Sequence, residues 1–127
     1  PTRMSTRQAQ VARSAARYLT DHVAKPLSMR EVARYHSLST PHFSSLFSRY
    51  HGVSPQRFLH QARIRHAKEL ISAGHLTIKE IAAVCGYVDA AHFCRRFKET
   101  TGVTPKQYRV TQPAEPSNSE QKKPRSV

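Results

Sequence analysis

At 127 residues, 38% of them hydrophobic, the chain can form one folded domain or two very small subdomains with a modest core. Its 21 Lys and Arg residues against 8 Asp and Glu residues give a net charge of +13. This favours an anionic partner, nucleic acid before a membrane surface or an acidic protein. No segment approaches the roughly 18 apolar residues of a membrane span, and no apolar signal region opens the chain, so we expect a cytoplasmic protein.

The chain carries repeated start signals for helices and none of the alternating patterns that are typical of strands. In an S/T-x-x-E/Q capping box, the two polar side chains satisfy free N–H groups at the start of a helix. Four such boxes are present: Ser5 with Gln8, Ser28 with Glu31, Thr77 with Glu80, and Thr104 with Gln107. Pro55 and Pro105 stand at first helical positions, where the missing N–H of proline costs nothing.

Apolar residues at three- and four-residue spacing predict an all-α protein of seven helices. The expected inward residues, in chain order, are Val11, Ala15, Tyr18, Leu19 and Val23; Val32 and Ala33; Phe43, Leu46, Phe47 and Tyr50; Phe58, Leu59, Ala62, Ala67, Leu70 and Ile71; Ile78, Ile81, Ala82 and Cys85; and Phe93 and Phe97. Residues 105–110 form the short seventh helix.

The second half of the chain repeats the first. With an offset of 50, residues 37–58 lie over residues 87–108. The identical pairs are His42/His92, Phe43/Phe93, Phe47/Phe97, Gly52/Gly102, Val53/Val103 and Pro55/Pro105. Before the turn the offset is 49, so we place one extra residue of the second copy in the Cys85–Gly86–Tyr87 turn. A duplicated helix, turn and helix indicates two helix-turn-helix units, because a plain stack of helical hairpins needs at least three copies.

These patterns predict a DNA-binding domain over residues 6–110. Its first helix-turn-helix spans about residues 28–50, its linker helix residues 55–73, and its second helix-turn-helix about residues 77–101. Residues 111–127 are rich in Pro, Ser, Gln and charge, so we expect a disordered tail.

A helix-turn-helix places the start of its second helix in the major groove. The residues expected to face the bases are Thr40, Pro41, Ser44 and Ser45 in the first unit, and Ala90, Ala91, Cys94 and Arg95 in the second. The residues expected to contact phosphate are Ser39, Arg49, Lys98 and Lys106. We expect Asp89 to be the N-cap of the second recognition helix. Arg95 is the strongest base reader, because its guanidinium matches the O6 and N7 acceptors of guanine. A phosphate-only contact and a solvated side chain are its alternatives.

The sequence indicates no metal, cofactor or catalytic site. His42 and His92 occupy equivalent positions, where a packing role is at least as reasonable as a base contact, and no ligand partners lie at metal-binding spacing. Cys85 lies on the apolar face of its helix and is expected in the core. No Ser/His/Asp arrangement or apolar carboxylate pair supports catalysis, so we do not expect an enzyme.

The predicted linker helix suggests how the two units would meet DNA. Residues 55–73 would span roughly 28 Å at 1.5 Å per residue. One DNA turn is about 34 Å, so two recognition helices could enter successive major grooves on one face of the duplex. Because the exposed faces of the two helices differ, the site would be asymmetric.

Three motifs in this order resemble the signature of the AraC/XylS family: R-I-x-x-A-x-x-L-I from Arg63, T-I-K-E-I-A-x-x-C-G-Y from Thr77, and H-F-x-R-x-F-K-x-x-x-G-V-T-P-K-Q-Y-R from His92. The similarity covers about residues 6–110. It implies a seven-helix fold in two subdomains and a role in transcription regulation, usually activation, with double-stranded DNA and RNA polymerase as partners. The resemblance also implies an N-terminal effector or dimerisation domain that this chain lacks, and the start at Pro1 favours a fragment of a longer protein.

The first unit departs from the family pattern at several positions. Members often have a basic residue where Ser45 and Ser48 stand, Pro one place before Pro41, and Gly where Ser37 stands. In the second unit, Arg96 replaces the apolar residue that Leu46 represents in the first. A non-specific architectural or RNA-binding protein is the competing function, and a basic surface without a partner is the simplest alternative. Similar affinity for unrelated sequences and a steep salt dependence would indicate the architectural protein.

Overall fold

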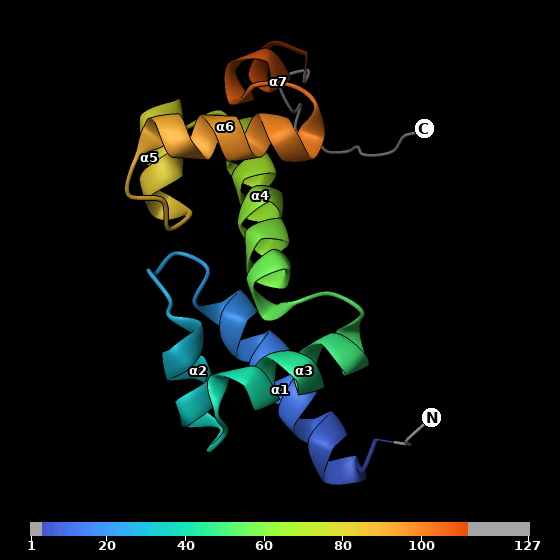
Figure 1. The fold of residues 1–127 in the computed structure, drawn as a ribbon. Coiled ribbons are helices and arrows are strands. Elements are labelled where there is room, and N and C mark those ends of the chain that lie inside the picture. Colours follow the sequence, from blue (N-terminus) through green and yellow to red (C-terminus); the bar gives the residue numbers. More distant parts are fainter. Residues whose placement is uncertain (1–3, 112–127) are drawn as a thin grey trace. The chain divides into compact units, whose positions relative to one another are not determined.

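The computed structural model describes residues 4–111, and within them every regular element is an α-helix (Figure 1). The helices are α1 Thr6–Asp21, α2 Met29–Tyr35, α3 Thr40–His51, α4 Pro55–Ala73, α5 Ile78–Val84, α6 Ala90–Thr101 and α7 Pro105–Thr111. The predicted all-α fold of seven helices is therefore confirmed. The expected tail lies outside the described residues, except that Thr111 is the last residue of α7. Over residues 4–111, no helix combines the length and the apolar character that crossing a bilayer requires.

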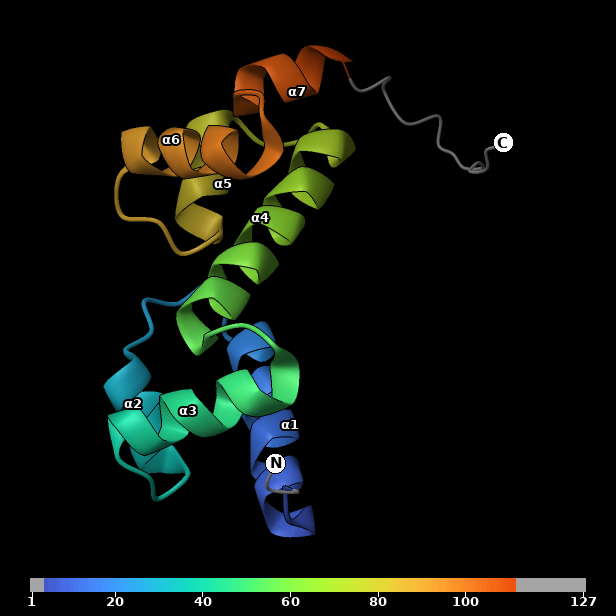
Figure 2. The ribbon, with the colours of Figure 1, turned by 45° about the vertical axis from the view of Figure 1, so that its right-hand side comes forward.

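The chain forms two compact units, which divide between Arg63 and Ile64, inside α4. The first unit contains α1, α2, α3 and the start of α4, and the second contains the remainder of α4 with α5, α6 and α7 (Figure 2). Each unit has its own hydrophobic core, so each recognition helix is supported locally.

The core of the first unit forms where α1 and α2 pack on α3. Its buried members are Ala15, Leu19, Val32, Ala33, Phe43, Phe47 and Leu59. The Phe47 ring lies 5.9 Å from Phe43 and 5.4 Å from Phe58 of α4, measured between centroids. Burial of these aromatic rings stabilises the unit through the hydrophobic effect.

Three expected inward positions of the first unit are wrong or shifted. Tyr50 is 39% exposed at the last turn of α3, and its hydroxyl accepts a 3.2 Å hydrogen bond from Arg13. Ala12 is fully buried in α1, whereas Val11 is half-buried. Val23 follows the end of α1 at Asp21, although it still packs on the core. The helices α1 and α3 pack on each other, and Ala12 lies on the buried face of α1.

In the second unit, α5 and α7 pack on α6. The buried residues are Ile64, Ala67, Ile71, Ile81, Ala82, Cys85, Tyr87, Phe93 and Phe97. Cys85 is fully buried, as expected. Ile64 was not among the expected inward residues, although it stands three residues before Ala67 on the same face of α4.

The helix starts follow the predicted capping signals. Both hydrogen bonds of the capping box are present at Ser5 and Gln8, at Thr77 and Glu80, and at Thr104 and Gln107. At α2, the Ser28 hydroxyl accepts from the N–H groups of Arg30 and Glu31, and the reciprocal bond from the Ser28 N–H to the Glu31 side chain is not formed. Pro55 and Pro105 are the first residues of α4 and α7, as predicted.

The turn between α2 and α3 and the turn between α5 and α6 share a positive φ and the same hydrogen-bond pattern at an offset of 49. Ser37 has φ 63° and Gly86 has φ 90°. Their N–H groups donate to Arg34 O and Ala83 O, and the next N–H groups, of Leu38 and Tyr87, donate to Ala33 O and Ala82 O. The offset of 49 therefore persists through Tyr87. The extra residue of the second copy is Val88, one position after the turn in which we expected it.

Candidate nucleic-acid interface

The expected recognition helix of the first unit, α3, begins at Thr40 and has Ser39 as its N-cap. The Ser39 hydroxyl accepts a 3.2 Å hydrogen bond from the N–H of His42, which leaves its own O–H as a donor at the start of the helix. Phe43 and Phe47 anchor the inner face. The outer face of α3 exposes Thr40, Pro41, Ser45 and Arg49, and Ser44 and Ser48 are half-buried at its edges.

The recognition helix of the second unit, α6, is built in the same way. Asp89 is the N-cap, as predicted, and its carboxylate accepts a 3.0 Å hydrogen bond from the N–H of Ala91. Phe93 and Phe97 are fully buried at the positions of Phe43 and Phe47. Each of these two helices is therefore capped at its N-terminus and packed onto its core through two phenylalanines.

The expected base-facing residues of α6 divide into two groups. Ala91 and Arg95 are exposed. Ala90 and Cys94 are half-buried and pack against the core of the second unit, so they have less surface to offer a ligand. Burial raises the pKa of the Cys94 thiol above its usual value, because the surroundings disfavour the thiolate.

An open hollow of about 460 Å³ lies on the outer face of α6. Its lining residues are Arg95, Lys98, Glu99 and Gly102. A carboxylate oxygen of Glu99 accepts a 2.9 Å charged hydrogen bond from Arg96, so the acidic side chain of the lining is paired with a cation. Arg95 and Lys98 are both exposed there, one helical turn apart. The hollow thus presents two cations where an anionic ligand could approach.

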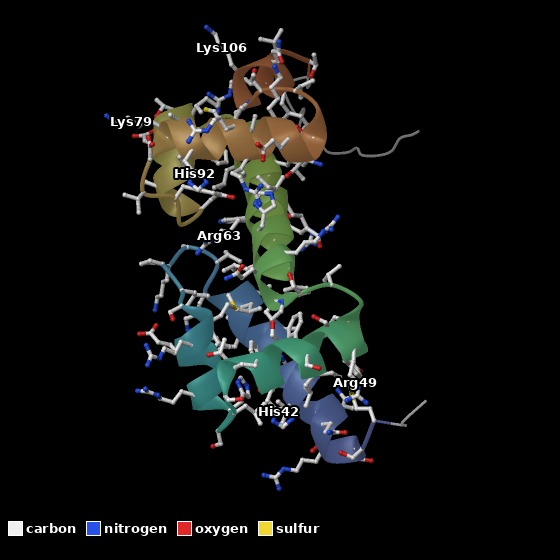
Figure 3. All side chains as sticks on the ribbon, viewed as in Figure 1. His42, Arg49, Arg63, Lys79, His92 and Lys106 are labelled. Atoms are coloured by element: carbon white, nitrogen blue, oxygen red, sulfur yellow. The ribbon has the colours of Figure 1, made fainter. Side chains whose placement is uncertain are left out.

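His42 and His92 are both exposed at the third position of their recognition helices. The packing role that the sequence left open for them is therefore not a buried one. The His92 ring lies 5.8 Å from the Tyr87 ring in an edge-to-face arrangement, whereas His42 projects from α3 in the first unit (Figure 3). The sequence drew attention to these two histidines because they occupy equivalent positions in the repeat. Because both are exposed, we add them to the candidate interface.

Two arginines within the motifs hold loops instead. The Arg63 guanidinium on α4 donates to Val23 O at 3.1 Å and to Lys25 O at 2.6 Å, which fastens the loop between α1 and α2. Arg109 on α7 donates to Leu76 O at 2.6 Å in the loop before α5. Lys106, also on α7, is exposed and projects from the surface (Figure 3). Of these three residues, Lys106 is the one that the sequence predicted to contact phosphate.

Within residues 4–111, no group of three or more His, Cys, Asp or Glu side chains is arranged to hold a metal ion. The chemistry of the exposed faces of α3 and α6 is that of hydroxyl donors, small side chains and cations. Such groups suit hydrogen bonds to base edges and charge-assisted contacts to phosphate.

Comparison with known proteins places these helices in a wider group. Residues 32–111 match the model of a family described as "Helix-turn-helix domain". An HTH-type transcriptional regulator of Staphylococcus aureus (strain MSSA476) is 40% identical over 103 residues, which are 81% of this chain and 14% of that protein. The chain spans 14–33% of the length of the staphylococcal and Escherichia coli regulators that it matches.

Two solved structures extend the comparison. The C-terminal domain of AraT, a response regulator from Geobacillus stearothermophilus, is 29% identical and superposes with a TM-score of 0.81 over 95% of this chain and 98% of that one. The DNA-binding domain of AdpA, a global transcriptional factor in complex with a target DNA, superposes with a TM-score of 0.79 over 84% of this chain and 97% of that one. The second is 20% identical, so this likeness is one of fold.

Proposed function

The chain belongs to the AraC-type helix-turn-helix family of DNA-binding transcription regulators, and on that premise we propose that it reads one asymmetric site on double-stranded DNA. In this proposal α3 and α6 enter adjacent major grooves. The family consists of regulators and not of enzymes, so binding is the activity to explain.

One observation carries the proposal. The two recognition helices are held alike and expose different chemistry. Phe43 and Phe47 anchor α3 as Phe93 and Phe97 anchor α6, with the same spacing from the N-cap. At one shared outward position, however, α3 has Ser45 and α6 has Arg95. Two helices that are held in the same way but expose different hydrogen-bond donors are suited to two different half-sites, and not to a palindromic site.

We assign base contacts to the outer faces of the first turns and phosphate contacts to their flanks. The proposed base-facing set is Thr40, Pro41, Ser44, Ser45, Ala90, Ala91, Cys94 and Arg95. The proposed phosphate-facing set is Ser39, Arg49, Lys98 and Lys106. Within the first set we expect Arg95 to contribute most, because a bidentate contact to guanine discriminates by about 1–3 kcal/mol. The half-buried Ala90 and Cys94 contribute chiefly by leaving room for the bases.

The length of α4 supports the proposed spacing of the two half-sites. This helix has 19 residues, which corresponds to roughly 28 Å at 1.5 Å per residue. A DNA turn is about 34 Å, so a continuous helix of this length suits recognition helices that occupy successive grooves on one face. We therefore propose that a single chain covers the whole site.

The partners of the complete regulator are further proposals. We propose RNA polymerase as a protein partner and an N-terminal effector or dimerisation domain in the full-length protein, which would act as an activator in the cytoplasm. The chain spans a minor part of its relatives, which leaves room for such a domain.

Selection from a random duplex library followed by footprinting tests the proposal. We expect one enriched, asymmetric sequence and protection of two adjacent major grooves on one face of about 20 base pairs by the monomer. A symmetric footprint that requires two chains would contradict this arrangement. Equal affinity for enriched and scrambled duplexes, with a steep salt slope, would instead support the architectural protein that the charge of +13 also permits.

A further inference from the structure

Val88 is the residue that the second helix-turn-helix has in addition to the first, and it is 98% exposed. It stands in the loop between α5 and α6, directly before the N-cap Asp89. Single exposed apolar side chains are common on protein surfaces, but a β-branched apolar side chain gains nothing from water and is available to a partner.

The usual reason for an apolar residue before an N-cap is a staple, in which it packs against the fourth residue of the helix. In the first unit Leu38 has this position, and it packs on the core that contains Phe43. In the second unit Phe93 is the fourth residue, but the exposure of Val88 rules out a staple contact. Tyr87 fills that role, with its ring 5.2 Å from the Phe93 ring. Val88 is thus left outside the core.

We propose that Val88 contacts the 5-methyl group of a thymine in the major groove and so reads one base pair beyond the reach of α6. The inference rests on the proposed function, in which the start of α6 enters that groove. The thymine methyl is the apolar group that base pairs present there, and apolar side chains recognise it. Because the first unit has no residue at this position, the contact belongs to the second half-site alone.

The test uses the full 127-residue chain and the duplex that it enriches most from a random library. Each thymine of that duplex is replaced in turn by deoxyuridine, which removes the 5-methyl group and preserves base pairing. The dissociation constant of each duplex is measured for the parent, Val88→Ala, Val88→Thr and Val110→Ala. Val110 is the matched control, because it is a 78% exposed valine on α7 of the same unit.

We expect one deoxyuridine substitution to weaken binding by the parent and by Val110→Ala about fourfold, the effect of losing one buried methyl group. Val88→Ala should bind the thymine duplex about fourfold more weakly than the parent and should not distinguish it from the deoxyuridine duplex. Val88→Thr, which keeps one methyl group, should show a partial effect.

Two other results are distinguishable. If a specific duplex is enriched but every thymine affects the parent and Val88→Ala equally, the thymine contact is wrong and the proposed function stands. If no sequence is enriched, the proposed function fails and the contact fails with it. Circular dichroism of Val88→Ala should match the parent, since the side chain packs on nothing within the unit.

Discussion

Phe97 and Tyr108 meet edge to face, with ring centroids 5.6 Å apart and an interplanar angle of 73°. Fifty residues earlier, Phe47 and Phe58 meet at 5.4 Å with the same angle of 73°. In each unit this contact fastens the helix that follows the recognition helix onto the inner face of that helix. The repeat therefore conserves the support of the recognition helix in three dimensions, including the geometry of an aromatic pair.

Truncation of these anchors should destabilise each unit. We expect Phe47→Ala and Phe97→Ala each to lower the free energy of unfolding by about 3–5 kcal/mol, the usual cost of removing a buried phenylalanine ring. Urea denaturation followed by circular dichroism measures this change. Val110→Ala, at an exposed site, is the control and should lie within about 0.5 kcal/mol of the parent. A Phe97 variant as stable as that control would contradict the anchoring role.

The turn residues Ser37 and Gly86 allow a paired test of backbone strain. Ser37 has φ 63°, a conformation that costs a residue with a side chain roughly 1 kcal/mol. Glycine adopts this conformation without strain, so Ser37→Gly should stabilise the first unit. Because glycine also loses more conformational entropy on folding, the gain should be at most about 1 kcal/mol. The reverse change, Gly86→Ser at φ 90°, should destabilise the second unit by about 1 kcal/mol. Thermal unfolding of both variants provides the measurement, and a shift in the same direction for both would refute the assignment.

The sequence predicted the parts of the fold that local chemistry determines. Capping boxes and first-position prolines located the helix starts, and the repeated phenylalanines located the centre of each core. The prediction that Tyr50 faces inward was wrong, because helical spacing does not show how far the core extends along the helix. At the last turn of α3 the tyrosine has moved past the core and instead bonds Arg13.

Three further features depended on tertiary structure. The choice of Ala12 over Val11 for burial follows from the close packing of α1 on α3, which sequence periodicity does not resolve. Sequence identity between the two repeats placed the extra residue of the second unit one position too early. The backbone dihedral angles and hydrogen bonds show that Leu38 corresponds to Tyr87. The exposure of Val88, His42 and His92 became known only with the structure. The base and phosphate contacts stay predictions.

The pair Leu46 and Arg96 tests how far the second unit tolerates its departure from the repeat. Leu46 is 3% exposed, so Leu46→Ala should cost about 2–5 kcal/mol. Arg96 is half-exposed and forms a 2.9 Å pair with Glu99, and such solvated pairs contribute under about 1 kcal/mol. Arg96→Ala should therefore cost much less than Leu46→Ala in the same denaturation experiment. A larger loss at Arg96 would show that its side chain packs on the core.

The Cys94 thiol should react slowly. Burial raises its pKa above the usual value, so the reactive thiolate is scarcer at neutral pH than in a free cysteine. The labelling rate with a disulfide reagent should lie below that of free cysteine at pH 7 and should rise as the pH approaches the raised pKa. The Cys94→Ser variant reports the residual rate of Cys85, which is fully buried. Labelling as fast as free cysteine would indicate an exposed, unshifted thiol.

Ser45 and Arg95 occupy the same outward position of the two recognition helices, so their substitution compares the two units as base readers. If Arg95 forms a bidentate contact to guanine, Arg95→Ala should weaken binding to the selected duplex by about 1–3 kcal/mol and relax the preference at one base pair. Ser45→Ala should cost much less, because water readily replaces a single hydroxyl contact. Titration of the parent and both variants with selected and scrambled duplexes, at two salt concentrations, provides the measurement.

The same titrations separate a base contact from a phosphate contact at Arg95. An arginine that contacts only phosphate would weaken selected and scrambled duplexes alike when it is removed, and the salt slope would fall by about one unit. A base contact instead predicts a loss confined largely to the selected duplex. The open hollow beside Arg95 and Lys98 accommodates a phosphate as well, so Lys98→Ala is the matched phosphate variant and should show the uniform loss. If Ser45→Ala proves the more damaging change on the selected duplex alone, the first unit is the main reader and the assignment of roles is reversed.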